Sequence, residues 1–504
     1  NKPMIKRILS FTLSGIAAIS MTYAAADTVE LTAAGTLKDA VTTPASVTSL
    51  TVSGPMDAAD FDFINRNMPA LTAIDLSGAN IVAYAGTPVL TGYSASPADV
   101  LPAYALHGMK LTSVTLPASV TSLGECALAG IAATTLSLPH VTAVGDGAFA
   151  GAAKLTSVTL SSSEVTLGRL AFSGCSSLTS MTIEADRVSD GAFKDCTSLS
   201  SISLPAGLES IGKDAFMGCK SLKAFAFGAS LTAIGDGAFE ASGLESADMS
   251  ASTSLTSVGA WAFAKCAALA SVVLPESVQT VGQGAFFDDA VLASVILPSD
   301  LKNVEDFVMT GNAALNDDAV IPANAESIGR YAYKGMSGME RIVIPAGVTS
   351  IGDNAMEGMT SLAEIDAKSL KAVPELGQDV WKDVEQPEVA LLVGDAETGE
   401  LFKDADQWKE FKIDIPSLSQ DIVISDRDEM ADVKVGFEGR ILVITAASGL
   451  KDAVVGDING VLVPASSVGE QRATFDTSGM GEDFYTVSVT TADGRRGQFK
   501  LLRK

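Results

Sequence analysis

This sequence of 504 residues has little of what enzymes and nucleic-acid-binding proteins need. It contains two histidines, His107 and His140, and aromatic residues make up 6% of the chain. Two imidazoles leave little material for histidine-based catalysis or a zinc site. Lys and Arg number 34 against 60 Asp and Glu, so the net charge is −26 and the basic surface that phosphate contacts need is missing. We therefore expect no catalysis, no cofactor, no metal and no nucleic-acid partner.

Charge and long hydrophobic runs are also scarce. Charged residues make up 19% and hydrophobic residues 47%, which excludes intrinsic disorder and predicts a large, mostly aliphatic core. Basic residues precede an apolar run at 8–19, and Ala24–Ala26 follow it, which is typical of a secretory signal peptide. We expect residues 1–26 to be this signal peptide, cleaved after Ala26. The run is shorter than the ~20 residues of a membrane span, and no later stretch is hydrophobic enough to be one.

The middle of the chain repeats one unit, written L-T-S-V-T-L-P-x-x-V-T-S-I-G-D-G-A-F-x-G-C. The second residue of its A-F pair serves as a marker, and it recurs twelve times at intervals of 21 to 24 residues. The markers are Leu106, Leu128, Phe149, Phe172, Phe193, Phe216, Phe239, Phe263, Phe286, Met309, Tyr333 and Met356. A constant period in this range is typical of a leucine-rich solenoid.

One unit shows the physical reason for stacking. Leu155, Val158 and Leu160 alternate with Ser157 and Thr159, which predicts a short strand with an apolar inner side. The A-F pair adds interior volume further along the unit. No unit can bury its apolar side alone, so each must stack on its neighbours. The predicted fold is mostly β with short turns or helices: a leucine-rich repeat solenoid of parallel stacked strands.

The flanks of the repeat depart from its period. Residues 27–102 read as strand, helix and strand, and we interpret them as an N-terminal cap with the first repeat-like turns. The solenoid then covers residues 103–372, with an irregular unit expected at 304–322. Residues 373–418 carry two of the three tryptophans and are expected to form a C-terminal cap.

Residues 419–504 change to alternating strand patterns. About seven short strands in this segment predict a small antiparallel β-sandwich. The expected strands are Val433–Phe437, Ile441–Thr445, Ala453–Asp457, Gly460–Val463, Ala473–Asp476, Tyr485–Val489 and Gln498–Leu502. Asn459-Gly460 and Asp493-Gly494 are hairpin turn signals.

Two resemblances follow from these patterns. The motif L-x-x-V-x-L-P-x-x-V-x-x-I-G-x-x-A-F-x-x-C, over about residues 103–365, is similar to the BspA-like leucine-rich repeat family of bacterial surface proteins. This resemblance implies a parallel-sheet solenoid and adhesion or recognition at cell surfaces rather than catalysis. The ending F-Y-T-V-S-V-T-T-A-D-G-R-R-G-Q-F-K-L-L-R-K resembles the C-terminal sorting domain of type IX secretion, although Gly481 and Tyr485 are separated by more residues than in that family. The alternative is an immunoglobulin-like tail domain with a basic end.

The outward side chains of the repeat strands are the candidate binding surface, because stacked strands present the largest regular surface of a solenoid. The surface is rich in hydroxyl groups early in the repeat and mixed apolar and charged later. The candidate ligand-binding residues are Ser157, Thr159, Ser180, Thr182, Ser201, Ser203, Val273, Ile296, Arg341 and Val343.

Cysteines and acidic residues at several positions are further candidates for metal binding. Cys175, Cys196, Cys219 and Cys266 share one repeat position, and small buried thiols are favoured over a disulfide or metal there. Asp146, Asp236 and Asp353 of the G-D-G turns could suggest a calcium stack, but turn chemistry explains them. The acidic stretch Asp426, Asp428, Glu429 and Asp432 and the tetrad Asp457-Ile458-Asn459-Gly460 are weaker calcium candidates, and we interpret them as a linker and a hairpin.

Two functions remain open. The first is an exported, non-catalytic protein at the extracellular or outer-membrane surface, which binds a protein or glycan ligand through the solenoid face. The alternative is a structural, self-associating envelope component anchored by its tail domain. The sequence does not indicate the oligomeric state.

Overall fold

A computed structural model of the chain describes residues 25–90, 92–161, 164–316, 320–414, 423–424, 432–438, 441–457, 462–463, 465–477 and 484–502. Apart from Ala25 and Ala26, the predicted signal peptide lies outside these residues. The chain divides into two compact units, Asn1–Leu244 and Glu245–Lys504, which we call unit 1 and unit 2 and describe one at a time. Among the described residues, no helix is long and apolar enough to cross a membrane.

Unit 1 opens with three parallel strands and a helix. Strands β1 (Ala25–Glu30), β2 (Val47–Met56) and β3 (Ala73–Ile81) pair in that order, and α2 (Ala58–Asn67) connects β2 to β3. This is the expected order of strand, helix and strand. The short helices α1 (Leu37–Ala40) and η1 (Pro44–Ser46) lie between β1 and β2.

The beginning of α2 is fixed by a capping box. The side chain of Asp57 accepts a hydrogen bond from the N–H of Ala59, and Asp60 in turn accepts one from the N–H of Asp57. The buried Asp60 carboxylate also accepts from the N–H groups of Gly35 and Leu37. These bonds join the β1–β2 connection to the helix.

A hairpin that the sequence patterns did not indicate follows β3. It consists of β4 (Tyr84–Val89) and β5 (Tyr93–Ser96). The phenol of Tyr93 donates to Glu125, whose carboxylate also accepts a hydrogen bond from Tyr104 at 2.8 Å. The bond from Tyr93 attaches the hairpin to the first repeat turns, and the bond from Tyr104 joins two of those turns.

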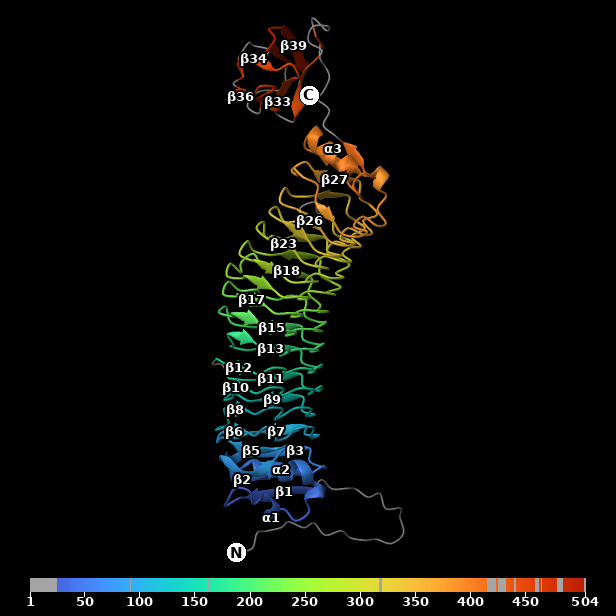
Figure 1. Cartoon of the computed structure of the whole chain (residues 1–504). Helices are drawn as coiled ribbons and strands as arrows, with labels where there is room; N and C mark the ends of the chain where they lie inside the picture. Colours follow the sequence, from blue (N-terminus) through green and yellow to red (C-terminus); the bar gives the residue numbers. More distant parts are fainter. Residues whose placement is uncertain are drawn as a thin grey trace. The chain divides into compact units, whose positions relative to one another are not determined.

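Apart from two irregular coils described below, each repeat coil contributes two short strands, and each strand pairs in parallel with an equivalent strand one coil away (Figure 1). In unit 1 the first strands are β7 (Ser113–Thr115), β9 (Thr135–Ser137), β11 (Ser157–Thr159), β13 (Ser180–Thr182) and β15 (Ser201–Ser203). The second strands of unit 1 are β6 (Val100–Leu101), β8 (Ser122–Leu123), β10 (Ala143–Val144), β12 (Thr166–Leu167), β14 (Arg187–Val188), β16 (Ser210–Ile211) and β17 (Ala233–Ile234).

Unit 2 repeats the same arrangement. Its first strands are β18 (Ser246–Asp248), β20 (Ser271–Val273), β22 (Ser294–Ile296), β25 (Arg341–Val343), β27 (Glu364–Ala367), β29 (Ala390–Val393) and β30 (Lys412–Asp414). Its second strands are β19 (Ser257–Val258), β21 (Thr280–Val281), β23 (Asn303–Val304), β24 (Ser327–Ile328), β26 (Ser350–Ile351) and β28 (Glu375–Leu376). The predicted fold class, parallel stacked strands of a repeat solenoid, is confirmed.

The twelve marker residues form the centre of the interior, and each has 0% exposure. In unit 1 the rings of Phe149, Phe172, Phe193, Phe216 and Phe239 stack on one another with centroids 4.8 to 5.4 Å apart. In unit 2, Phe263 and Phe286 stack at 5.8 Å. Because each of these coils contributes one ring, the rings stack at about the distance that separates neighbouring coils.

The residue two positions before each marker has a positive φ. Several are bulky, such as Leu170 (φ 56°) and Trp261 (φ 58°), a conformation that disfavours side chains. In both cases the next coil has glycine at that position. A Cβ on Gly191 would lie 2.5 Å from Leu170 Cδ2, and one on Gly284 would lie 2.4 Å from the indole of Trp261. In these two coils the bulky side chain lies across the following glycine, where a Cβ would clash with it.

Two coils are irregular. In the expected irregular unit at 304–322, Val308 and Met309 are buried as usual and no strand is assigned at 320–322. Residues 317–319 of that unit lie outside the described part of the chain. A second irregular coil was not predicted: residues 223–227 form no strand, and the ring of Phe225 packs edge-on against Phe216 and Phe239.

The stack ends in unit 2 with an aromatic cluster. Helix α3 (Ala396–Asp404) follows β29, and η2 (Gln386–Glu388) precedes it. Trp381 and Trp408 pack at 5.2 Å, and both also contact Phe411. Both tryptophans are buried, as a segment that closes a repeat core requires.

The tail forms two antiparallel sheets that enclose one hydrophobic core. One sheet has the order β31–β39–β38–β34–β35 and the other β32–β33–β37–β36. Their bounds are β31 (Val423–Ile424), β32 (Val433–Glu438), β33 (Ile441–Ala446), β34 (Leu450–Asp457), β35 (Leu462–Val463), β36 (Ala465–Val468), β37 (Arg472–Asp476), β38 (Phe484–Thr491) and β39 (Arg496–Leu502). Val435 and Ile444 of one sheet pack with Val487 and Phe499 of the other. The predicted antiparallel sandwich is confirmed.

All seven predicted tail strands are present, and β31 and β36 were not foreseen. The Asp493-Gly494 turn joins β38 to β39, with Gly494 at φ 94°. Asn459-Gly460 and Gly481 of the sorting-domain resemblance lie outside the described residues. The structure therefore establishes the sandwich fold of the tail, and the resemblance to a sorting domain stays a prediction.

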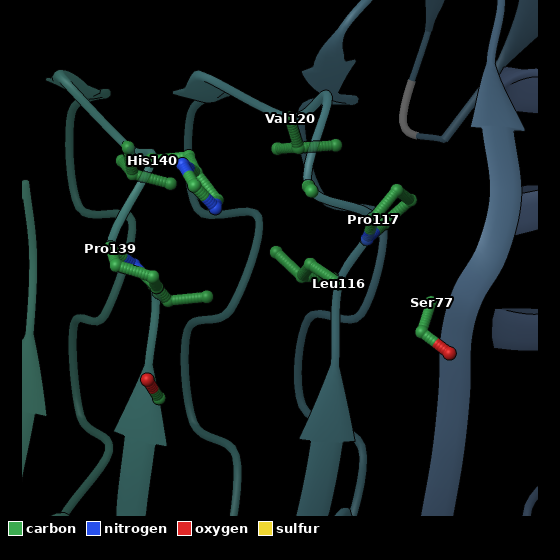
Figure 2. Close-up of a pocket in the computed structure, with 10 residues that line it drawn as sticks. Ser77, Leu116, Pro117, Val120, Pro139 and His140 are labelled. Atoms are coloured by element: carbon green, nitrogen blue, oxygen red, sulfur yellow. The ribbon is translucent and has the colours of Figure 1, made fainter.

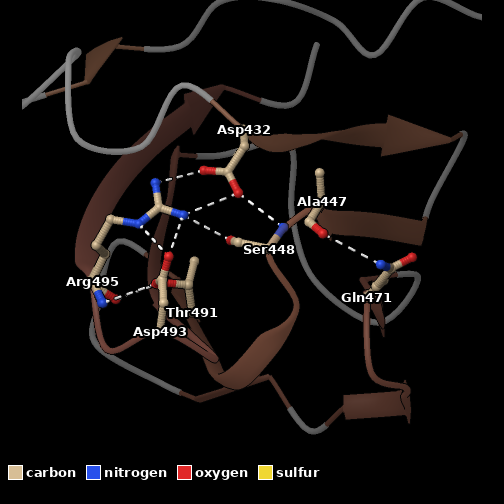
Figure 3. Close-up of polar contacts among 7 residues, drawn as sticks. All are labelled: Asp432, Ala447, Ser448, Gln471, Thr491, Asp493 and Arg495. Carbon is tan, nitrogen blue, oxygen red and sulfur yellow. Dashed lines mark hydrogen bonds and ion pairs between the residues drawn. The ribbon is translucent and has the colours of Figure 1, made fainter.

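Arg495 ties the start of β32 to the β38–β39 hairpin (Figure 3). Its guanidinium donates to Asp432 Oδ1 at 2.7 Å, to Asp493 Oδ2 at 2.9 Å and to Ser448 Oγ at 2.8 Å. Hydrogen bonding to Arg495 lowers the pKa of Asp493 to about 2 and lowers the pKa of Asp432 further. Asp432 is thus engaged by an arginine, and the rest of its predicted acidic stretch lies outside the described residues.

Candidate functional site

The predicted hydroxyl surface exists in unit 1. All six of its residues, Ser157, Thr159, Ser180, Thr182, Ser201 and Ser203, are exposed, and the residues between them point inward. Parallel pairing places Ser157 beside Thr135 and Thr159 beside Ser137, and Ser180 beside Ser201. The hydroxyl groups therefore form two columns across neighbouring coils.

The four predicted residues of unit 2 differ from one another. Ile296 is 53% exposed, whereas Val273 and Val343 are half-buried. Arg341 bonds Glu364 at 2.6 Å and Asp366 at 2.7 Å, so two carboxylates on the neighbouring strand neutralise its charge. This part of the surface presents an apolar spot and an internal ion pair.

Two hollows lie where the first strands of unit 1 end and the chain turns toward the second strand. The first, which we call the proline hollow, has a volume of about 230 Å³ (Figure 2). It is lined by Ser77, Leu116, Pro117, Ala118, Val120, Ser137, Leu138, Pro139, His140 and Val141. Pro117 and Pro139 come from successive coils, and Ser77 lies on β3, which continues past the point where the first repeat coil turns away.

The second, which we call the hydroxyl hollow, has a volume of about 390 Å³. Its lining residues are Ser157, Val158, Thr159, Leu160, Ser161, Ser180, Met181, Thr182 and Glu184. It contains four of the six predicted hydroxyl residues. Ser201 and Ser203 lie on the next strand and do not line it.

Backbone hydrogen bonds connect the walls of the two hollows. The N–H of Leu138 donates to the carbonyl of Thr159 at 2.8 Å, and the N–H of Ser161 donates to the carbonyl of Val141 at 3.2 Å. The hollows are thus adjacent along the stack, on coils held in fixed register. Rigid placement of this kind favours recognition, because little is reorganised on binding.

Charge near the hollows is acidic. Glu184 lines the hydroxyl hollow, and the exposed Glu164 is one coil away, where the N–H of Val165 donates to the carbonyl of Glu184. Within the described part of the chain, neither carboxylate has an ion-pair partner. Neither Lys nor Arg lines either hollow.

The sequence patterns indicated four residues of the hydroxyl hollow but none of those that line the proline hollow as binding residues. Leu116-Pro117 and Leu138-Pro139 recur at one repeat position, which could have indicated a corner. From the sequence, His140 is considered only for catalysis or a zinc site, whereas it lies at the rim of the proline hollow. Nothing in the sequence signalled the depth of the hollow, which depends on the continuation of β3.

The turn aspartates bind backbone rather than metal. Asp146 Oδ1 accepts the N–H of Arg169 at 2.7 Å, and Asp353 Oδ1 accepts the N–H of Gln378 at 2.7 Å. Each aspartate therefore caps the turn of the following coil. Among the residues described, no three His, Cys, Asp or Glu gather as metal ligands. Residues 458–460 of the Asp457 tetrad lie outside that set.

The cysteines are free and mostly buried. In unit 1 the thiols of Cys175, Cys196 and Cys219 donate to the carbonyls of Phe149, Phe172 and Phe193, at 3.1 to 3.2 Å. Burial raises the pKa of Cys175 and of Cys219 to about 12, so these thiols stay protonated and unreactive. Their role is structural, as predicted.

Comparison with known proteins supports this architecture. The profile described as "BspA type Leucine rich repeat region" matches six copies over residues 99–188, 186–316 and 314–386. A leucine-rich repeat protein from Bacteroides ovatus has a similar structure, with 20% identity and a TM-score of 0.51 over 75% of this chain and 86% of that one. That similarity shows the fold.

Two further solved structures match with lower scores. A leucine-rich cell surface protein from Faecalibacterium prausnitzii has 24% identity and a TM-score of 0.31, over 56% of this chain and 86% of that one. The pneumococcal vaccine antigen PcpA has 17% identity and a TM-score of 0.38, over 74% of this chain and 80% of that one. No curated protein matches significantly. Because the repeat profile spans residues 99–386, 288 of the 504 residues, the chain belongs to the BspA-type leucine-rich repeat family.

Proposed function

We propose that this protein is exported to the extracellular or outer-membrane surface and there binds a protein or glycan ligand through the first-strand face, without catalysis. The observation that carries the proposal is the pair of adjacent hollows on a rigid, hydroxyl-rich face in unit 1. A regular repeat surface of this kind is well suited to recognition.

Three further observations support the proposal. The family is that of bacterial leucine-rich repeats. The sequence begins with a signal-peptide pattern, and the hollows lack ionisable pairs of the kind that acid–base catalysis uses. His140 is the one imidazole at the hollows, and neither lining contains a cysteine.

The test compares binding by the full chain and by the double variant Thr159→Arg, Thr182→Arg. Two arginines on the exposed face would obstruct the hydroxyl hollow, and we expect capture of surface proteins or glycans to fall at least about tenfold. Thr166→Arg is the matched control, because Thr166 is also an exposed strand threonine but lies on β12. Equal capture by all three proteins would contradict a binding role for the first-strand face.

A further inference from the structure

We propose that the two hollows form one docking groove for an extended peptide of a protein partner. The peptide inserts a large apolar side chain into the proline hollow and places a Lys or Arg side chain beside Glu164 and Glu184. This inference rests on the proposed function and names the chemical class of its ligand.

The proline hollow suits a single apolar side chain. The buried side chains of Val120, Leu138 and Val141 line it. Pro117 and Pro139, from two coils, flank it (Figure 2). At about 230 Å³ it is smaller than the ~300–1,000 Å³ pockets that enclose whole small molecules. Partner side chains that fill such pockets commonly carry much of the binding free energy of an interface.

Charge complementarity specifies the second contact. Glu184 and Glu164 are exposed, and neither has an ion-pair partner within the described residues. A Lys or Arg side chain of the docked peptide would form an ion pair with these carboxylates. The net charge of −26 would favour the approach of such a cationic peptide. The charge therefore predicts a basic residue in the docked segment.

The lining favours a peptide over a glycan. Sugar rings are commonly held by aromatic side chains that stack on their faces, and apart from the imidazole of His140 no aromatic ring lines either hollow. The centres of the hollows are two coils apart, roughly 10 Å at ~4.8 Å per coil, which is about three residues of an extended chain. We therefore expect the apolar and basic residues about three positions apart.

The experiment selects random nine-residue peptides displayed on phage against the full chain. Ser137→Trp is used for counter-selection, because this exposed position lines the proline hollow and an indole there would fill it. We expect the enriched peptides to share a large apolar residue and a Lys or Arg about three positions from it. A representative synthetic peptide should bind about tenfold more weakly to Ser137→Trp and about fivefold more weakly to Glu184→Lys.

Two controls make the test specific. Replacing the peptide's basic residue by Glu should restore binding to Glu184→Lys, which a merely misfolded variant would not do. Thr166→Trp, at an exposed position on β12 that lines neither hollow, should bind the peptide as the unmodified chain does.

Enriched peptides without the apolar–basic pair, or equal binding to Ser137→Trp, would overturn the docking inference. Selective binding of neutral glycans on an array, lost in Ser137→Trp, would overturn the peptide class and leave the proposed function standing. The proposed function fails separately, when the arginine variants of the first-strand face capture surface ligands as well as the unmodified chain does.

Discussion

The side chain three positions after each marker occupies one slot that differs from coil to coil. In unit 1 it holds Cys175, Cys196 and Cys219, whose thiols donate to backbone carbonyls. In unit 2 the slot holds Asp289 and Asn312, both fully buried. Asp289 Oδ1 accepts the N–H of Cys266 at 2.7 Å, and its Oδ2 has no hydrogen-bond partner among the described residues. Burial raises the pKa of Asp289 to about 8. The hydrogen bond from the N–H of Cys266 opposes this rise, and the charge of Asp288 adds to it.

We therefore predict that stability depends on the protonation of Asp289. The folded protein holds a proton at this site that the unfolded chain releases near pH 3.8. The stabilising contribution of Asp289 is therefore fully present below that pH and is lost as the pH rises toward about 8. Asp289→Asn should remove this fall and unfold at higher urea concentration than the unmodified chain at pH 9. Asp288→Asn, an exposed neighbour, should keep most of the pH dependence, because burial and not the charge of Asp288 is the main cause of the raised pKa. Urea midpoints at pH 5, 7 and 9 measure both, and parallel curves for all three proteins would refute the assignment.

The stacked rings make a second prediction at the same scale. Phe193 has 0% exposure and stacks at 5.4 Å on both Phe172 and Phe216. Phe193→Ala should lower the free energy of unfolding by about 3–5 kcal/mol, because the neighbouring coils cannot collapse into the cavity. Ser201→Ala, an exposed change in the same unit, should alter it by about 0.5 kcal/mol or less. Chemical denaturation distinguishes the two, and equal effects would mean that the ring column carries little of the stability.

At the scale of the element, several turns depend on an aspartate acceptor from the coil before them. Asp353 lies over Gly377, where a Cβ would be 2.3 Å from Asp353 Oδ1, and it accepts the N–H of Gln378. Asp353→Ala should cost about 1–2 kcal/mol, because that N–H loses its partner. Asp353→Asn keeps a side-chain oxygen and should cost less. Hydrogen exchange at the N–H of Gln378 measures the difference between the two variants. Unchanged protection of this N–H in Asp353→Ala would contradict the capping role.

The tail sandwich depends on a different contact. Arg495 joins Asp432 to Asp493, and hydrogen bonds to Arg495 lower the pKa of both carboxyls. Arg495→Gln should raise hydrogen exchange in β32 and in the β38–β39 hairpin of the full chain. Because both pKa values are lowered, the contribution is present above about pH 4 and is lost as the pH falls. Arg496→Gln, the exposed neighbour, is the control, and equal exchange in both variants would show that the contact is dispensable.

At the scale of the whole molecule, the resemblance of the tail to a sorting domain predicts that the tail directs the chain to the cell surface. We predict that a chain lacking residues 419–504 is no longer accessible to external protease on intact cells, whereas the full chain is. The full-length Thr166→Arg variant controls for effects of mutation on display. Undiminished accessibility of the truncated chain would remove the sorting role and favour an ordinary tail domain. Light scattering of the purified full chain separately tests the structural alternative, because a strictly monomeric profile would undercut self-association.

The sequence by itself determined the repeat. Its period, the twelve markers, the alternation of Ser157, Val158 and Thr159, and the seven tail strands are all local patterns, and local patterns report which side of a chain is buried. The cysteine slot and the turn aspartates could be interpreted the same way, since each recurs at a fixed position in its unit. The placement of Leu170 and Trp261 at positive φ could not be interpreted in this way, because their side chains lie over Gly191 and Gly284 of the next coil.

Only the tertiary structure decided where a ligand could be bound. The proline hollow exists because β3 continues beyond the first repeat coil while two proline corners turn away from it, and Ser77 and His140 are far apart in sequence. The pairing of Arg341 with Glu364 and Asp366 likewise depends on which strands are neighbours. Burial follows from the order of apolar residues along one unit, whereas a hollow and its charge follow from the register between units, which no single unit encodes.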